Sequence, residues 1–378
     1  AAHRSALYAR VQRWQVLQGA DATGTILAPY QREPQLGLRL RGPVGAGLEV
    51  ALETEVNRFT RGDALASATL PTGWRWHAVG SLSRNWEGEA WWLRPRLTVN
   101  AASYSADQVL GSTGSRNASR TLPTFSLDTG MVFERESHWF GRNQRQTLEP
   151  RLLYVNTPYR DQRHLPKWDT AGRDFNLVSV FSENAFTGID RVSDAHQMTA
   201  GVTSRWLDDA TGAETLRLGI AQRFLFRDQR VTAGEIAGAG LEPDGPAFTQ
   251  RFSDLLLEGS TSLVPHWRFD ASMQYSADTA RPLRSIVGAR WQPGPFRTLG
   301  ATYRLARGLS EQLDVGWQWP VYQREGNTAP APGGGRCGGV LYTVGRVNYS
   351  LKDSRITDSV FGFEYDAGCW IGRVVAER

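Results

Sequence analysis

The stretch Leu148-Glu149-Pro150-Arg151-Leu152-Leu153-Tyr154-Val155 opens the region that decides the fold, because its pattern is that of a β-strand. The segment that follows, 156–195, has no regular period. Two further strand-like segments close the region at Phe226, and the short turn Leu207-Asp208-Asp209-Ala210-Thr211-Gly212 joins them. One very long connection beside one very short connection is the asymmetry on which the prediction of the fold rests.

Alternation of apolar and polar residues is the dominant pattern of the chain. It is clear in segments 48–57, 91–100, 197–206, 267–276 and 341–350, each with one apolar and one polar face. We count about seventeen such segments, and no helical period of comparable strength competes with them. The sequence therefore predicts an all-β protein.

The length of these segments favours a membrane protein. Many run roughly nine to twelve residues, whereas an average soluble strand has about five or six and a tilted membrane-spanning strand needs about nine to eleven. Aromatic residues often stand at their ends, where the interfacial girdles of a membrane barrel lie. A soluble propeller or sandwich, in which tryptophan packs a core, is the alternative, and strand length and loop asymmetry argue against it.

Composition is compatible with that prediction. The 378 residues are 40% hydrophobic, with a mean hydropathy of −0.41 and no apolar run long enough for a membrane helix. Because barrel strands alternate between lipid-facing and interior residues, their average hydropathy cancels. The 14 tryptophans and 39 glycines suit many strands and turns. The fold class that we predict is a large antiparallel transmembrane β-barrel.

The lengths of the connections alternate along the chain. Connections at 208–212, 264–266 and 293–295 are short, whereas 102–122, 156–195 and 227–252 are predicted to be long loops. Outer-membrane barrels place short turns in the periplasm and long loops outside the cell. The same count puts 319–339 and 366–369 on the periplasmic side, although 319–339 carries a Gly/Pro-rich insertion at 327–336.

Charge points to an anionic ligand or to internal ion pairs. The net charge is +5, and all 43 basic residues except Lys167 and Lys352 are arginine. A guanidinium group binds phosphate or carboxylate through two parallel hydrogen bonds. Codon bias together with interior arginines paired to Asp and Glu is the alternative interpretation, and it is favoured.

Motifs for catalysis, cofactors, metals and nucleic acid are missing from the sequence. Six histidines are scattered without metal-ligand spacing, and no Gly-x-Ser-x-Gly, Walker or dinucleotide motif occurs. Glu49, Glu53 and Glu55 lie on one face of a predicted strand, which we interpret as charge lining of an interior rather than as an acid/base pair. Arginine is spread over most strands instead of forming one basic patch, so the sequence does not indicate a nucleic-acid-binding protein. We therefore predict no enzyme activity, no cofactor and no metal site.

Four specific motifs carry more information than the composition does. They read Leu148-Glu149-Pro150-Arg151, Pro158-Tyr159-Arg160-Asp161-Gln162, Gly188-Ile189-Asp190-Arg191 and Gly201-Val202-Thr203-Ser204-Arg205-Trp206-Leu207-Asp208-Asp209. In this order they resemble the C-terminal barrel region of the LptD family, the lipopolysaccharide (LPS) assembly proteins of Gram-negative outer membranes. Supporting stretches at 29–36, 131–135 and 345–351 extend the resemblance over nearly the whole chain.

The resemblance implies a fold, a location and partners. The fold is a fragment of a barrel of about 26 strands in the cell outer membrane, surrounded by outer-membrane lipid. The partners are the lipoprotein LptE as a plug in the interior, an LptA-type periplasmic bridge, the barrel-assembly machinery, and LPS as the substrate, which leaves through a lateral opening. We expect residues 1–378 to form one incomplete barrel domain, with the N-terminal periplasmic domain, the first strands and the last strand outside this chain.

The resemblance also bears on the two cysteines. The family pattern has two adjacent cysteines near the C-terminus that form disulfides with cysteines near the N-terminus, whereas this chain reads Gly368-Cys369-Trp370. Cys369 is therefore expected to pair with a cysteine outside the chain, and Cys337 is an alternative partner. A non-reducing peptide map of the full-length protein tests this expectation, and a free thiol at Cys369 in active protein would contradict it.

Two groups of residues are candidates for function. Both signs of charge occur in the loop 156–195, so we expect it to fold over or into the barrel mouth as an internally paired cap; its candidate residues are Tyr159, Arg160, Asp161, Asp190 and Arg191. Candidate interior contacts to anionic sugar or to the plug are Arg94, Arg96, Arg205, Arg217 and Arg268. For each of these arginines, a salt bridge to a neighbouring strand is the favoured alternative.

Alternative functions remain open at the level of the sequence. A passive porin or a ligand-gated outer-membrane transporter would have the same architecture. A surface adhesin built on the long loops belongs to a different class, and an outer-membrane lipase would need a Ser/His constellation that the sequence does not indicate.

Overall fold

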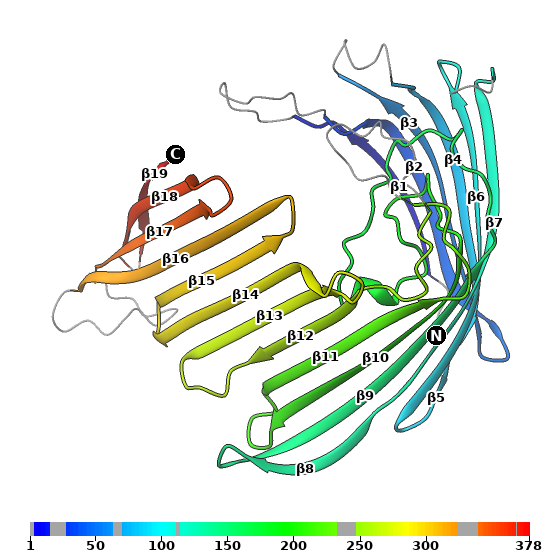
Figure 1. Cartoon of the computed structure of the whole chain (residues 1–378). Coiled ribbons are helices and arrows are strands. Elements are labelled where there is room, and N and C mark those ends of the chain that lie inside the picture. Colours follow the sequence, from blue (N-terminus) through cyan, green and yellow to red (C-terminus); the bar gives the residue numbers. More distant parts are fainter. Residues whose placement is uncertain are drawn as a thin grey trace. The chain divides into compact units, whose positions relative to one another are not determined.

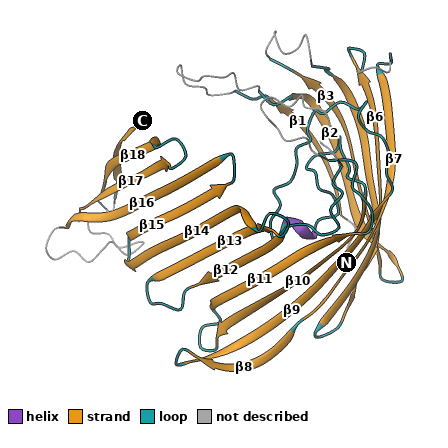
Figure 2. Ribbon diagram, viewed as in Figure 1, coloured by secondary structure: helices purple, strands orange, loops and turns teal. Residues whose placement is uncertain are grey.

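The computed structural model describes residues 4–15, 28–62, 70–110, 114–232, 247–323, 339–367 and 369–378. Within these ranges the chain is almost entirely antiparallel β-sheet, with nineteen strands and one short 3-10 helix, η2 (Ser179–Phe181) (Figure 2). No helix of the described residues is long and apolar enough to cross a membrane.

The strands confirm the predicted fold class. Their bounds are β1 (Arg4–Gln12), β2 (Gln31–Gly45), β3 (Leu48–Thr60), β4 (Gly73–Arg84), β5 (Trp86–Glu87), β6 (Trp91–Ala106), β7 (Asn117–Met131), β8 (Phe133–Trp139), β9 (Arg142–Thr157), β10 (Ala195–Asp208), β11 (Glu214–Leu225), β12 (Leu255–Thr261), β13 (Trp267–Ser276), β14 (Arg281–Gly294), β15 (Arg297–Ala306), β16 (Ser310–Gln323), β17 (Val340–Ser350), β18 (Arg355–Asp366) and β19 (Ile371–Glu377).

Neighbours in the chain are also neighbours in the sheet. Each hairpin has a regular antiparallel register, for example from Leu48 opposite Arg84 to Phe59 opposite Gly73 between β3 and β4. β5 has only two residues, and β7 and β8 both pair with β9 on either side of Val132, so they act as one interrupted strand. The number of long strands therefore agrees with the sequence-based count.

The described chain divides into two compact units. Unit 1 contains Ala1–Met131, Pro150–Ala200 and Gln222–Ser253, and unit 2 contains Val132–Glu149, Gly201–Ala221 and Asp254–Arg378. Long antiparallel hairpins dominate both units (Figure 1).

The burial pattern of the strands is the reverse of that in a soluble protein. In β4, the apolar side chains of Trp74 and Trp76 are exposed, whereas Arg75 and His77 between them are buried. In β6, Leu97 is exposed in the same way. Because large apolar surfaces are buried in soluble monomers, the outward-facing apolar side chains indicate strands surrounded by lipid. We call the two sides of each strand the apolar face and the polar face.

Aromatic side chains mark one end of the strands in unit 2. The rings of Trp267 and Trp291 stack with centroids 6.2 Å apart, and Trp291 stacks on Trp319 at 5.5 Å. These residues are close to the short connections β12–β13 and β14–β15. A row of tryptophans at strand ends is the arrangement of an interfacial girdle.

The connections agree with the predicted long loops, except for the extent of one of them. β9 ends at Thr157 and β10 begins at Ala195, as the sequence indicates. The loop predicted at 102–122 is shorter, because β6 continues to Ala106 and β7 begins at Asn117. Small and polar residues such as Ser103 and Ser105 obscured the alternation there. The insertion 327–336 lies outside the described residues.

Candidate functional site: a folded loop and a cationic pocket

The segment 158–194, between β9 and β10, covers the polar face of strands in unit 1 (Figure 1). Trp168 stacks on Phe59 of β3 with a centroid distance of 4.8 Å and lies 5.6 Å from the ring of Tyr104 of β6. The indole Nε1 of Trp168 donates a hydrogen bond of 2.7 Å to the carbonyl of Pro71. Together with Leu165 these side chains form a buried apolar cluster that fixes the loop to the strands.

An ion-pair network lies beside this cluster. Arg75 of β4, only 1% exposed, donates to Asp190 Oδ1 and to Asp169 Oδ2, both at 2.7 Å. Asp190 is completely buried, and its Oδ2 accepts the backbone N–H groups of Trp168 and Asp169 at 2.6 and 2.9 Å. Asp169 Oδ1 accepts the N–H of Ile189. Because buried charges require partners, the strand side chain Arg75 organises two distant parts of the loop.

The two carboxyl groups bound to Arg75 titrate differently. Burial, followed by the nearby Asp169 carboxylate, raises the pKa of Asp190. Burial acts in the same direction on Asp169, but the Arg75 guanidinium outweighs it and lowers the pKa of that carboxyl. Acidification therefore protonates Asp190 first and leaves the ion pair between Arg75 and Asp169.

A second arginine from a strand holds the same loop. Arg120 of β7 donates to the carbonyls of Asp190 and Ile189 at 2.8 and 2.7 Å and to Gln162 Oε1 at 2.8 Å. Arg191, also buried, donates to the carbonyl of Leu165 at 3.0 Å. Backbone carbonyls that strand pairing does not satisfy thus accept hydrogen bonds from guanidinium groups.

The loop residues predicted from the sequence occupy two different environments. Asp190 and Arg191 are part of the buried network. Asp161 is exposed and bonds Arg163 at 2.8 Å, and hydrogen bonds from Arg163 lower the pKa of its carboxyl. Arg160 is exposed, and the Tyr159 ring lies 3.4 Å from the guanidinium of Arg230.

Sequence reasoning missed Arg75, Arg120, Asp169 and Trp168. A weak signal existed in Trp74-Arg75-Trp76, where a charged residue stands between two outward-facing tryptophans. The pairing of Arg75 with Asp190 could not be recognised from the sequence, because the two residues are 115 positions apart in the chain.

A pocket of about 460 Å3 opens on the polar face of unit 1. Four arginines and two carboxylates line it, so its ionised side chains carry a positive excess; they are Arg94, Arg96, Arg151, Arg173, Asp128 and Glu183. The pocket also contains uncharged polar side chains, including Ser83 and Asn85. The structure therefore brings together two of the five arginines predicted from the sequence, Arg94 and Arg96.

The ion pairs in and beside the pocket differ in distance, in number of hydrogen bonds and in exposure. Arg151 binds Asp128 through two hydrogen bonds of 2.9 Å. Arg96, which is half exposed, lies 3.6 Å from Glu183. Arg94 is 2.6 Å from Glu87, a residue that does not line the pocket. Loosely paired and exposed guanidinium groups can exchange their partners for an anionic ligand, because exposed ion pairs are worth only about 0–1 kcal/mol.

The other three predicted arginines belong to unit 2 and are paired with carboxylates. Arg205 lies 3.3 Å from Glu149, Arg217 lies 3.1 Å from Glu214, and Arg268 lies 3.2 Å from Asp270. These contacts agree with the salt-bridge alternative.

The two cysteines are not brought together in the described residues. Cys337 lies outside them. Cys369 is in the connection between β18 and β19, and its thiol is 3.7 Å from the carbonyl of Ala367. Disulfide pairing of either residue stays a prediction.

Comparisons with known proteins agree with the sequence motifs. Residues 2–330 match the family model LptD, described as LPS transport system D. The chain is 45% identical over 98% of its length to the LPS-assembly protein LptD of Albidiferax ferrireducens, and 43% identical over 100% to that of Paracidovorax citrulli. It is also 45% identical over 98% of its length to the LptD protein of a Polaromonas species. The chain covers 44–45% of these three relatives and thus spans less than half of their length.

Proposed function

Because the chain belongs to the LptD family of LPS transport proteins, we propose that it forms the outer-membrane β-barrel part of an LPS-assembly protein. In this proposal the apolar faces of the long strands contact lipid, and the polar faces accompany the hydrophilic part of LPS toward the outer leaflet. The family match supports LPS transport and gives no support to the passive porin alternative.

The cationic pocket is the observation that carries this proposal for the chain itself. LPS presents phosphate and carboxylate groups on a sugar framework, and guanidinium groups bind both through charge-assisted hydrogen bonds. The positive excess among the lining side chains suits such a ligand. Arg94 and Arg96 have exposed side chains, and we assign them the contact to the anionic groups.

The proposed partners follow from the family and not from a contact in this structure. They are the LptE lipoprotein plug, an LptA-type periplasmic bridge, the barrel-assembly machinery and outer-membrane lipid. Cys369 would form a disulfide with a cysteine of the periplasmic domain. A pull-down of the complete protein that recovers no LptE-type lipoprotein would contradict the first of these assignments.

Crosslinking tests the pocket directly. A photoreactive amino acid at Asn85, an uncharged lining residue, is placed in the complete protein in cells that export LPS. We expect an LPS adduct that appears only during transport. Substituting both Arg94→Gln and Arg96→Gln should reduce the adduct by at least about tenfold, since each hydrogen bond to a charged group contributes about 1.5–3 kcal/mol and every 1.4 kcal/mol is about tenfold in binding.

The matched control is Arg268→Gln, which removes an exposed arginine that is paired with Asp270 and does not line the pocket. It should leave the adduct unchanged. Transport that continues without any adduct at Asn85, or an adduct that does not respond to loss of Arg94 and Arg96, would show that LPS does not use this pocket.

A further inference from the structure

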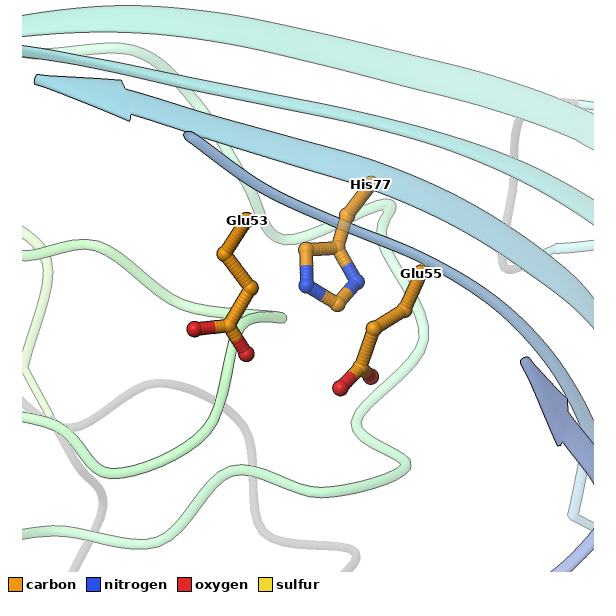
Figure 3. Close-up of side chains that lie close together, drawn as sticks. All are labelled: Glu53, Glu55 and His77. Atoms are coloured by element: carbon orange, nitrogen blue, oxygen red, sulfur yellow. The ribbon is translucent and has the colours of Figure 1, made fainter. Parts of the chain in front are cut away.

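A second group of polar side chains lies on the polar face of β3 and β4. Glu55 of β3 stands directly opposite His77 of β4 in the strand register, and Glu53 is the next residue of β3 on the same face. One ligand atom from each of the three lies within 4.8 Å of the others. Figure 3 shows the imidazole between the two glutamate side chains.

His77 is the most unusual member of this group. Its side chain is 1% exposed, and neither ring nitrogen has a hydrogen-bond partner among the described residues. Buried polar atoms are rarely left in this state because each costs free energy. An imidazole whose two nitrogens lack partners, beside two carboxylates, has the donor atoms of a metal ligand available.

Glu55, the carboxylate opposite His77, lacks a cationic partner among the described residues. It is 6% exposed and has no ion pair with any described residue, although buried carboxylates are normally paired or coordinate a metal. Its two oxygens accept hydrogen bonds from neutral groups, among them the Tyr8 hydroxyl and Asn57 Nδ2. Such bonds hold a carboxylate in place while leaving lone pairs for a cation.

The neighbouring arginines Arg75 and Arg39 pair with other carboxylates and not with Glu55. Arg75 is committed to Asp169 and Asp190 in the loop. Arg39 lies 2.9 Å from one oxygen of Glu53, whose side chain is 40% exposed and has its second oxygen available. Gly37 allows the ring of Tyr8 to lie against β2, because a Cβ there would meet that ring at 2.3 Å. The tyrosine hydroxyl reaches Glu55 for this reason.

We propose that Glu53, Glu55 and His77 form a binding site for a divalent first-row transition-metal ion of the Zn²⁺ class. One imidazole nitrogen and two carboxylate oxygens are three protein ligands, which leaves a fourth tetrahedral position for water or for an anionic group. Tetrahedral ligands about 2.0–2.1 Å from Zn²⁺ are about 3.4 Å apart, so the donors must draw together. The exposed side chain of Glu53 provides this movement. Ca²⁺ and Mg²⁺ are disfavoured because they prefer all-oxygen ligand sets.

The sequence did not reveal this site because its residues come from two strands. Glu53 and Glu55 stand two apart in β3, whereas His77 is contributed by β4 across the hairpin. Spacing rules detect ligands within one element, and they carry no information about strand register.

Metal binding to the complete protein, purified in detergent and stripped with a chelator, tests the proposal. We expect one equivalent of Zn²⁺ per chain and visible d–d absorption when Co²⁺ replaces it. His77→Ala and Glu55→Gln should each weaken Zn²⁺ binding by at least tenfold, and Tyr8→Phe should weaken it by about tenfold through loss of the hydrogen bond to Glu55.

Glu49→Gln is the control, because Glu49 lies on the same face of β3 but bonds Arg41 at 3.1 Å. It should bind Zn²⁺ as the unmodified protein does. X-ray absorption at the zinc edge of the unmodified protein, which needs no variant to fold, should show nitrogen and oxygen ligands with one imidazole. Absence of Zn²⁺ binding, binding that survives His77→Ala, or a spectrum without imidazole would each overturn the proposal.

Discussion

Two aspartates of the same loop, Asp161 and Asp190, differ in burial and in their ion-pair partners. Asp161 and Asp190 both precede or follow an arginine in a motif, and the sequence treats them as equivalent members of a charged loop. In the structure Asp161 bonds its near neighbour Arg163 in an exposed turn, whereas Asp190 is completely buried against Arg75. The difference depends on a partner 115 residues away, so it could not be predicted from local sequence.

Substituting Asp190→Ala should release the loop. It leaves the buried Arg75 with Asp169 alone, and removing one partner of a buried pair costs about 3–5 kcal/mol. Arg163, Lys167 and Arg173 are trypsin sites in the loop. Cleavage there should become at least about a hundredfold faster, since every 1.4 kcal/mol is about tenfold in an equilibrium.

Asp161→Ala is the matched control for that experiment. Exposed ion pairs contribute about 0–1 kcal/mol, so tryptic cleavage should change by less than about fivefold. Equal cleavage rates for the Asp190→Ala variant and the unmodified protein would show that the Arg75 network does not hold the loop.

At the scale of the strand, the sequence was informative. Alternation in β13 identifies which side chains share a face, and the register places Ser272 of β13 opposite Glu258 of β12. The side chain of the next residue, Met273, is exposed on the apolar face. What alternation could not predict was which polar-face residues are buried, because the long loop covers some strands of unit 1 and its path has no period.

A lysine at two adjacent positions of β13 should therefore have opposite effects. Met273→Lys puts a charge on the lipid-facing side, which costs about 2–4 kcal/mol near the middle of a bilayer. Ser272→Lys puts the same charge opposite Glu258, where a cross-strand pair contributes about 0.2–1 kcal/mol. Urea unfolding of the complete protein in lipid vesicles measures both. Similar stabilities of the two variants would contradict the assignment of the faces.

At the scale of the whole molecule, strand length and burial predict the fold class, whereas the class of function was predicted from the family resemblance. Strand length and exposed apolar faces indicate a membrane β protein of either a passive or an active kind. The motifs at 148–151 and 188–191 resemble the LptD family, and the match of residues 2–330 to the LptD family model confirms that the chain belongs to this family. One of these motifs also carries the buried Asp190, so the residues that identify the family include those that fix the loop to the strands.

Because Asp190 and its partners fix segment 158–194 to the polar faces of the strands, we predict that this loop obstructs the passage of ions through the protein. Reconstituted in a planar bilayer, the complete protein should conduct ions weakly, because segment 158–194 covers polar strand faces that would otherwise meet water. Replacing 160–190 by a short Gly/Ser linker should raise the conductance severalfold, and Asp190→Ala should produce brief openings. A Gly/Ser replacement of 209–212, in the short β10–β11 turn, is the control and should leave the conductance unchanged. High, steady conductance of the unmodified protein would instead favour a passive porin.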